Sequence, residues 1–230
     1  MTPSEPRLYG RRKGRPLRVR KSALMQSLLP ELSLTLPTDA PLPPASLFMP
    51  PPTSCWLEIG FGSGSHLAAQ AAQHPDIGMI GCEPFINGIA GLLDHIDQAN
   101  LRNIRIYPGD ARLLLQCLAP ATLARAYILF ADPWPKKRHA ERRFVQQDTL
   151  LLLAGALLPD AELLLATDDP VLQEWTTEQM RVCPFFTPVT ATGISATRPP
   201  AWIPTRYEEK ALLAGRTPLY YRFKRNTALT

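Results

Sequence analysis

Cysteine is scarce in this 230-residue sequence, which contains only Cys55, Cys82, Cys117 and Cys183. No two of them form a Cys-x-x-Cys pair or another spacing that is typical of zinc ligands. The pattern argues against a disulfide framework and against a cysteine-ligated ion, so we expect no metal site. Isolated cysteines bordering apolar runs are usually reduced and buried, which fits a cytoplasmic protein.

Long hydrophobic runs are also absent. The longest one, LLLLAGALL at residues 150–158, is far shorter than the roughly 20 apolar residues that a membrane-spanning helix needs. Near the N-terminus, polar residues and Pro30 interrupt the segment SALMQSLLPEL, so it lacks the apolar core of a signal peptide. We therefore expect no membrane association and predict a cytoplasmic location.

Positive charge is present but unevenly distributed. Residues 1–21 contain eight basic residues and one acid, a net charge of +7, which leaves −2 for residues 22–230. Basic segments of this kind bind nucleic acid or anionic membranes, or are simply solvated, and the composition leaves these alternatives open. We predict a flexible basic arm over residues 1–21.

Proline divides the arm from the rest of the chain. Seven prolines fall within residues 37–52, and proline-rich segments are stiff and extended. We expect residues 22–53 to form a short helix followed by this strap. The compact domain is then predicted at residues 54–230.

Strands and helices alternate through the predicted domain. We expect strands at 55–60, 78–84, 103–110, 125–132 and 161–168. Helices are expected at 66–74, 86–99, 111–117 and 141–158, and a last helix follows residue 168 and runs through about residue 182. Strands separated by helices form a parallel sheet covered on both faces. Residues 217–225 alternate and predict an antiparallel edge strand. The expected fold is Rossmann-like α/β, with a mostly parallel sheet, helices on both faces and an antiparallel last strand.

A glycine-rich turn, LEIGFGSGSHL, joins the first predicted strand to a helix. Gly60, Gly62 and Gly64 allow a tight turn and close approach of a ligand. The dinucleotide fingerprint Gly-x-Gly-x-x-Gly is not met, because Ser65 occupies its sixth position. Glu58 would also repel a pyrophosphate, and suits a cationic ligand such as a sulfonium with its ammonium group.

Further acids end the later predicted strands, namely Glu83, Asp110, Asp132 and Asp168. Ligands of open α/β sheets bind at the carboxyl ends of the strands, so these acids would line one rim together with Glu58. Glu83 would accept from two ribose hydroxyls and Asp110 from an adenine amino group. The predicted ligand is S-adenosylmethionine (AdoMet), although a single acid at such a position can equally be a helix N-cap.

Asp132 stands out because a basic patch follows it in FADPWPKKRHAERR. The patch comprises Lys136, Lys137, Arg138, His139, Arg142 and Arg143. Cations on the early turns of a helix oppose its dipole, which favours phosphate contact over the alternative of a solvated charged face. Trp134 could stack on an extruded base or pack into the core.

The motifs LEIGFGSG, GCEP, GDA, FADPWPKKRHAERRFVQ, ATDD and TRYEEKALLAGRTPLYYRF occur in this order, after YGRRKGRPLRVRKSAL. Together they resemble the bacterial tRNA (guanine-N7)-methyltransferase family, over the whole chain except the proline strap. The resemblance implies a class I methyltransferase fold, AdoMet as cofactor, and tRNA as partner, methylated at N7 of a guanosine in the variable loop (position 46). It leaves the oligomeric state open between monomer and homodimer.

The resemblance also carries roles to individual positions. The cofactor positions are Glu58, Gly60, Gly62, Gly64, Glu83, Asp110, Ala111 and Asp132. Asp132 is also the presumed catalytic residue. The substrate positions are Lys136, Asp168, Thr205, Arg206, Tyr207 and Glu208. We further expect RNA contacts from Lys137, Arg138, Arg142, Arg143, Arg11, Arg12 and Lys13. Without the resemblance, residues 205–208 would be an ordinary loop entering the last strand.

The chemistry agrees with these assignments. Guanine N7 has a lone pair and no proton, so methylation needs in-line placement and no general base. We therefore expect Asp132 to position the base and stabilise positive charge. Two rivals remain: an amino-methyltransferase, whose motif would be Asp/Asn-Pro-Pro-aromatic where this chain has Asp132-Pro133-Trp134, and a non-catalytic RNA-binding protein.

Overall fold

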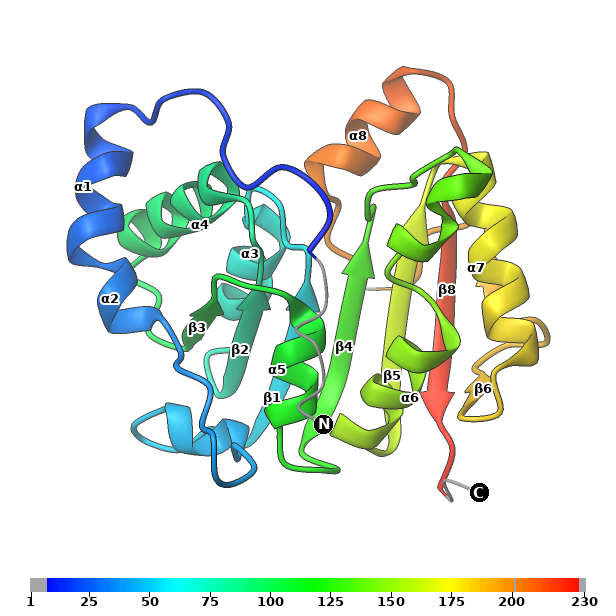
Figure 1. Cartoon of the computed structure of the whole chain (residues 1–230), viewed down its shortest axis with the longest axis horizontal. Coiled ribbons are helices and arrows are strands. Elements are labelled where there is room, and N and C mark those ends of the chain that lie inside the picture. Colours follow the sequence, from blue (N-terminus) through cyan, green and yellow to red (C-terminus); the bar gives the residue numbers. More distant parts are fainter. Residues whose placement is uncertain (1–7, 201, 228–230) are drawn as a thin grey trace.

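A computed structural model of the chain describes residues 8–200 and 202–227, which form one mostly parallel sheet with helices on both faces (Figure 1). The strand order is β3-β2-β1-β4-β5-β8-β6, with β7 paired to β8. The strands are β1 (Ser54–Ile59), β2 (Ile77–Cys82), β3 (Ile104–Tyr107), β4 (Leu123–Leu129), β5 (Leu157–Thr167), β6 (Phe186–Pro188), β7 (Ile194–Ser195) and β8 (Leu219–Arg225). The first five pair in parallel and β8 is antiparallel, which confirms the predicted fold class.

The helices cover the sheet in two layers. They are α1 (Val19–Ser27), α2 (Leu29–Leu32), α3 (Ser65–Gln73), α4 (Ile86–Ala99), α5 (Ala111–Cys117), α6 (Gln147–Ala156), α7 (Pro170–Val182) and α8 (Arg206–Leu213), with 3-10 turns η1 (Pro44–Leu47) and η2 (Lys137–Arg142). Leu114, Leu150 and Met180 place α5, α6 and α7 in one core. Leu67 and Leu92 place α3 and α4 in the core of the opposite face. Successive residues of a strand point to opposite faces, so β1 contributes to both cores.

The strands that lead to the predicted rim are shorter than expected. β3 ends at Tyr107 and β4 at Leu129, so Asp110 and Asp132 each follow their strand by three residues. Glu83 directly follows β2. In Figure 1 the arrowheads of β4 and β5 point to the same end of the molecule, where α8 also lies. The acids therefore sit on loops at the carboxyl ends of the strands.

The prediction of one long helix at 141–158 is wrong. The chain forms the turn η2, an extended segment, and then α6, which begins only at Gln147. A capping box fixes this start, since the Gln146 N–H donates to the Thr149 hydroxyl (3.1 Å) and the Gln146 side chain caps the Thr149 N–H. The apolar residues at the far end continue as β5, where Leu157 pairs with Leu123 of β4.

The last strand was expected at the edge of the sheet, and this is also wrong. β8 lies inside the sheet, with β5 on one side and the short strands β6 and β7 on the other. The segment before it is α8 and not a loop, because Thr205 and Glu208 form a capping box at its start. The pattern Thr-x-x-Glu was a signal for this helix in the sequence.

The proline strap lies at the opposite end of the sheet from the acids (Figure 1). It carries η1 and the buried Phe48, whose ring covers Gly78 so closely that a Cβ there would lie 2.7 Å from it. The guanidinium of Arg105 lies 4.8 Å from the Phe48 ring centroid and its Nε donates to the Leu47 carbonyl (2.8 Å). The strap thus closes the core below the amino ends of the strands.

Helix α1 packs on α4 and crosses the boundary predicted at residue 21. Arg20, counted in the arm, pairs with Asp94 (2.9 Å) and Asp97 (2.7 Å) of α4. The first seven residues of the predicted arm lie outside the described residues. The division into arm, strap and domain stays a prediction. Within residues 8–200 and 202–227, no helix is long and apolar enough to cross a membrane.

Candidate active site

A cavity of about 570 Å³ opens at the carboxyl ends of β1, β2 and β4, a volume typical of small-molecule sites. Of the predicted site residues, it is lined by Gly60, Gly62, Glu83, Asp110, Ala111, Asp132, Tyr207, Arg11, Arg142 and Arg143. The residues predicted for the site that are not part of this lining are Glu58, Gly64, Lys136, Lys137, Arg138, Asp168, Thr205, Arg206, Glu208, Arg12 and Lys13. The structure therefore gathers most of the predicted cofactor residues and separates several of those predicted for RNA or substrate.

The glycine turn forms one wall of the cavity. Gly60, Gly62 and Gly64 have φ of +71°, +55° and +76°, a left-handed conformation that glycine adopts without strain. Gly88 of α4 packs against this turn, because a Cβ on it would lie 2.3 Å from the Gly62 carbonyl oxygen. The turn is therefore held between its own backbone conformation and α4.

Glu83 faces the turn from the end of β2. Its Oε2 accepts from the Gly62 N–H (2.8 Å) and its Oε1 accepts from the Phe85 N–H (2.9 Å). Burial raises the pKa of Glu83, while these backbone hydrogen bonds act in the opposite direction. Each carboxylate oxygen has a further lone pair, so the residue fits the predicted ribose hydroxyls.

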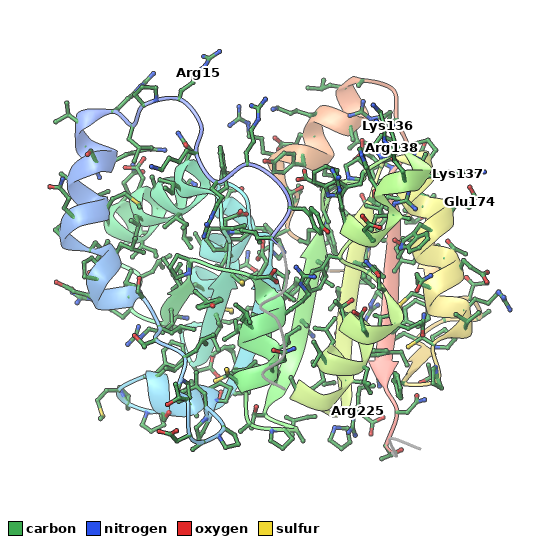
Figure 2. The ribbon with its side chains drawn as sticks, in the orientation of Figure 1. Arg15, Lys136, Lys137, Arg138, Glu174 and Arg225 are labelled. Carbon is green, nitrogen blue, oxygen red and sulfur yellow. The ribbon has the colours of Figure 1, made fainter. Side chains whose placement is uncertain are left out.

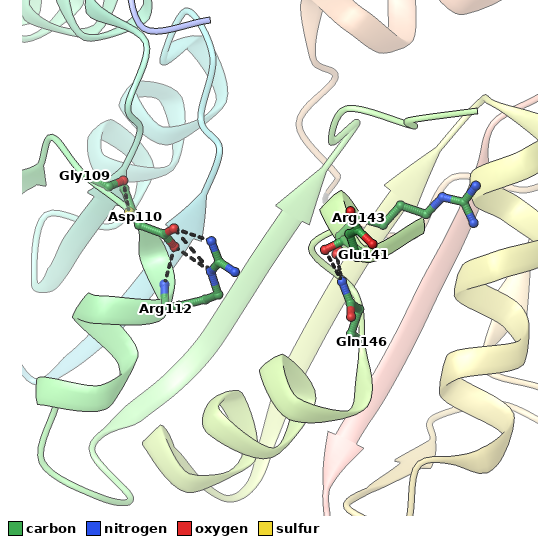
Figure 3. A network of polar contacts seen from close by, with 7 residues as sticks. Gly109, Asp110, Arg112, Glu141, Arg143 and Gln146 are labelled. Carbon is green, nitrogen blue, oxygen red and sulfur yellow. Dashed lines mark hydrogen bonds and ion pairs between the residues drawn. The ribbon is translucent and has the colours of Figure 1, made fainter. Parts of the chain in front are cut away.

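Asp110 combines both alternatives that the sequence left open. It caps α5 by accepting from the Arg112 N–H (2.9 Å), and its Oδ2 pairs with the Arg112 guanidinium (2.6 Å), as Figure 3 shows. It also lines the cavity, where Ala111 follows it. The carboxylate is thus oriented by α5 and by Arg112 at the place predicted for the adenine end of AdoMet.

Glu58 lies behind the glycine turn and does not line the cavity. Its Oε2 lies 2.7 Å from Nδ1 of His66, and His66 Nε2 lies 3.2 Å from Nε2 of Gln70. Glu58 and His66 are each only 2% exposed. Sequence reasoning missed His66 as the partner of Glu58, although both flank the turn. Direct contact between Glu58 and AdoMet stays a prediction.

Asp132 is exposed on the loop that follows β4. Two residues of this loop, Phe130 and Trp134, have φ of +53° and +43°, which is uncommon for residues other than glycine. Arg143 is only 5% exposed, and it donates to the carbonyls of Pro133 (3.2 Å) and Trp134 (3.1 Å). This burial argues against the predicted RNA contact of Arg143.

Part of the predicted arm lies across the cavity. Gly10 is so close to Asp132 that a Cβ on it would lie 3.6 Å from Oδ2. The guanidinium of Arg142 lies 5.1 Å from the ring centroids of both Tyr9 and Trp134. Tyr9 begins the quoted segment YGRRKGRPLRVRKSAL, but sequence reasoning gave it no role. The arm also binds α4 through its backbone, since the Arg12 carbonyl accepts from the Ile86 N–H (3.0 Å).

The exposed cations of the basic patch are Lys136, Lys137 and Arg138. Figure 2 places them at the same end of the molecule as Arg15 of the arm. Lys137 and Arg138 lie in a 3-10 turn and not on the early turns of a long helix, so the expected conflict with a helix dipole does not arise. Their exposure at this end is the feature that supports phosphate contact.

The four residues 205–208 divide into two pairs. Thr205 and Glu208 are buried, and the Glu208 carboxylate accepts from Arg198 (2.6 Å), Tyr220 (2.6 Å) and Trp202 (2.8 Å). Arg206 and Tyr207 are exposed, and the Tyr207 ring covers the glycine turn: a Cβ on Gly62 would lie 2.9 Å from it. Glu208 is therefore committed inside the fold, and Tyr207 is the member of this set that reaches the cavity.

Asp168 and Glu208, two acids predicted to contact the substrate, are both paired with arginines. Asp168 accepts from Arg216 (2.5 Å), so its predicted substrate contact would have to share the carboxylate with that ion pair. Burial alone would raise the pKa of Glu208, but hydrogen bonds from Tyr220, Trp202 and Arg198 outweigh it and lower the pKa.

Within the described ranges, no group of acidic, histidine and cysteine side chains is arranged to hold a metal ion.

The sheet order and the cavity at its glycine turn define a class I methyltransferase. The crystal structure of the 16S rRNA methyltransferase KamB has this fold, with a TM-score of 0.57 and 12% identity over 80% of this chain and 91% of that one. TrmN from Thermus thermophilus is similar over 89% of this chain and 48% of its own, with a TM-score of 0.52 and 15% identity. At these identities the likeness establishes the fold alone.

Sequence comparison identifies the family. Residues 52–220 match a family described as "Putative methyltransferase". The chain is 45% identical to a tRNA (guanine-N(7)-)-methyltransferase of Paramagnetospirillum magneticum, over 96% of this chain and 93% of that protein. It is also 45% identical to the Rhodospirillum rubrum protein of the same name, over 96% and 88%. The chain belongs to the tRNA (guanine-N7)-methyltransferase family, which confirms the resemblance and its enzyme class, with AdoMet as methyl donor.

We predict that Gly88→Ala weakens AdoMet binding. The new Cβ meets the Gly62 carbonyl, so the glycine turn must shift, and overpacking of this kind costs about 1–3 kcal/mol. Isothermal titration with AdoMet and urea unfolding measure the two effects. Gly155→Ala in α6 is the control: no atom lies within 4 Å of its Cβ, and alanine favours a helix over glycine by up to about 1 kcal/mol. Equal AdoMet affinity in both variants would contradict the prediction.

We predict that Glu208→Gln removes a pH-dependent part of the stability. Because the folded pKa is lowered, the charged carboxylate stabilises the fold above the ordinary glutamate pKa of about 4.3, and this stabilisation is lost as pH falls through the folded pKa. Urea unfolding at pH 7 should show a loss of about 1–3 kcal/mol, and the difference from the original chain should shrink below about pH 4. Exposed Glu209→Gln is the control. A difference that is the same at every pH would refute this.

Proposed function

We propose that the chain transfers the methyl group of AdoMet to N7 of a guanosine in the variable loop of tRNA, with Asp132 as the catalytic residue. One observation carries the proposal: exposed Asp132 lines the same cavity as the glycine turn and Glu83, which are joined by a hydrogen bond. Family membership supplies the reaction class. A tRNA substrate also supports the predicted cytoplasmic location.

The residues of the cavity suit AdoMet. Glu83 would accept from the ribose hydroxyls, since both of its oxygens face backbone donors and keep a free lone pair. Asp110 and Ala111 would border the adenine, and the left-handed glycines leave room for close approach of the backbone. Bound AdoMet supplies an electrophilic methyl group carried on a sulfonium. The exposed ring of Tyr207 covers the turn and would limit access of water there.

Asp132 acts on the base and takes no proton from it. Guanine N7 has no hydrogen, so the reaction needs placement of its lone pair in line with the methyl group. The carboxylate can accept from the guanine N1–H and amino group, a donor pair that adenine lacks, which gives base selectivity. As the purine becomes positively charged, the same carboxylate stabilises it.

The basic surface beside the cavity would hold the tRNA backbone. Lys136, Lys137 and Arg138 are exposed at the end of the molecule where the cavity opens, and Arg12 and Lys13 lie on the arm beside α4. Charge contacts with phosphates supply affinity without sequence information. The guanosine must leave its stack to reach Asp132, and Trp134 lies next to that position.

The test is methylation of unmodified tRNA with labelled AdoMet, followed by digestion to nucleosides. Label should appear in 7-methylguanosine, and it should disappear with Asp132→Ala while tRNA binding stays largely intact. Activity should also persist below pH 7, because no base has to be deprotonated. Label in N6-methyladenosine, no label, or complete loss of activity at slightly acidic pH would each contradict this proposal.

A second prediction concerns the arm. Replacing Arg12 and Lys13 by serine should weaken tRNA binding and flatten its salt dependence by up to about two in the log–log slope, because each cation releases roughly one counterion. AdoMet affinity should not change, since neither residue lines the cavity. Lys224→Ser, exposed on β8, is the matched control. Filter binding at several salt concentrations measures the slopes, and a slope shared by both variants would disprove this role of the arm.

A further inference from the structure

The loop that carries Asp132 is held in an uncommon conformation. Phe130 and Trp134, which lie two residues before and after Asp132, both have positive φ, and neither is glycine. Such conformations persist only where surrounding contacts determine them. The loop therefore needs a specific restraint, and the question is which side chain provides it.

Arg143 provides that restraint. Its Nε donates to the Pro133 carbonyl (3.2 Å) and its Nη2 to the Trp134 carbonyl (3.1 Å). These two carbonyls stand on either side of the Trp134 Cα, so their directions define φ and ψ of that residue. A planar guanidinium offers donors in a fixed fork, which makes the pair of bonds a geometric constraint and not only an attraction.

Arg143 is itself immobilised. Its guanidinium lies 4.7 Å from the ring centroid of Trp175 in α7, and Trp175 Nε1 donates to the Val145 carbonyl (2.6 Å). The Gln146 side chain donates to the Arg143 carbonyl (2.6 Å), and Figure 3 shows the Arg143 side chain extending away from this contact toward α7. Among the residues that the structure describes, no carboxylate lies within ion-pair distance of it. Its charge is directed to carbonyls and to an aromatic face.

We propose that Arg143 is a positioning residue for methyl transfer, which sets the place of Asp132 by fixing the backbone at Pro133 and Trp134. The inference rests on the proposed function of Asp132. It assigns different tasks to neighbouring cations: Arg143 holds the loop from inside, whereas exposed Arg138 is available to phosphate. A lysine at 143 would keep the charge and lose the fork, so charge and geometry can be separated.

The experiment compares Arg143→Lys, Arg143→Ala and the control Arg138→Ala. Methyl transfer is measured in a single turnover at saturating tRNA and AdoMet, beside tRNA affinity at several salt concentrations. Misplacement by about 1 Å can cost about a hundredfold in rate, so we expect Arg143→Lys to be about ten- to a hundredfold slower. Its tRNA affinity should stay within about twofold and its salt slope should not change. Arg138→Ala should show the reverse pattern in binding: a weaker tRNA affinity and a flatter salt slope.

A second readout does not depend on turnover. Hydrogen–deuterium exchange of the peptide covering residues 130–138 should be faster in Arg143→Lys than in the original chain, and unchanged in Arg138→Ala. Thermal unfolding and AdoMet affinity show whether each variant is folded. If Arg143→Ala does not fold, the comparison of Arg143→Lys with the original chain tests the proposal alone. If the original chain does not methylate tRNA, the proposed function is contradicted. The exchange experiment would still show whether Arg143 restrains the loop. A normal saturated rate with unchanged exchange in Arg143→Lys would overturn the proposal.

Discussion

The hydrogen bond from the Gly62 N–H to the Glu83 carboxylate joins the two strand ends on which the site is built. β1 and β2 are parallel neighbours, so their carboxyl ends meet at one edge of the sheet, and the turn after β1 must avoid the loop after β2. The left-handed glycines allow the N–H to face the acid, and Gly88 lets α4 approach from the other side. The contact therefore ties together two of the segments that line the cavity.

The other acids near this edge differ in how their charge is balanced. Glu58 is committed to His66, Asp110 to Arg112 and its helix, and Glu208 to three donors around α8. Among the described residues, Asp132 has neither a hydrogen bond nor an ion pair to the protein, and it is exposed. A carboxylate without a protein partner is available to a ligand, and this holds for Asp132 and also for exposed Glu141, which lines the same cavity. Glu58, Asp110 and Glu208 are thus held by contacts within the fold, and Asp132 is the residue proposed to contact the base.

The sequence predicted the central sheet well because its signals are local. Alternating apolar segments separated by glycine, proline and acids located five parallel strands within a few residues, and α4 and α5 were predicted at their observed bounds. The start of α6 and the helix α8 were missed, although the Thr-x-x-Glu box of α8 was visible. Partners such as Trp175 for Arg143, or Trp202 for Glu208, come from separate elements. No spacing rule brings them together, so burial and the true role of such charges could not be predicted.

The basic residues near the site offset the negative charge of its acids. A rim of carboxylates repels the phosphates of an RNA, yet the proposed contacts to the cofactor and to the base use those carboxylates. Exposed cations of the loop beyond Asp132 lie at the same end of the molecule as Arg15 of the arm (Figure 2), while Arg11 and Arg142 line the cavity itself. In the proposed function, the cations that would attract the RNA backbone and the carboxylate that would contact the base lie a few residues apart on one chain segment. Arg143 belongs to the same run of cations, but it is buried, and its guanidinium donates to the carbonyls of Pro133 and Trp134, which directly follow Asp132.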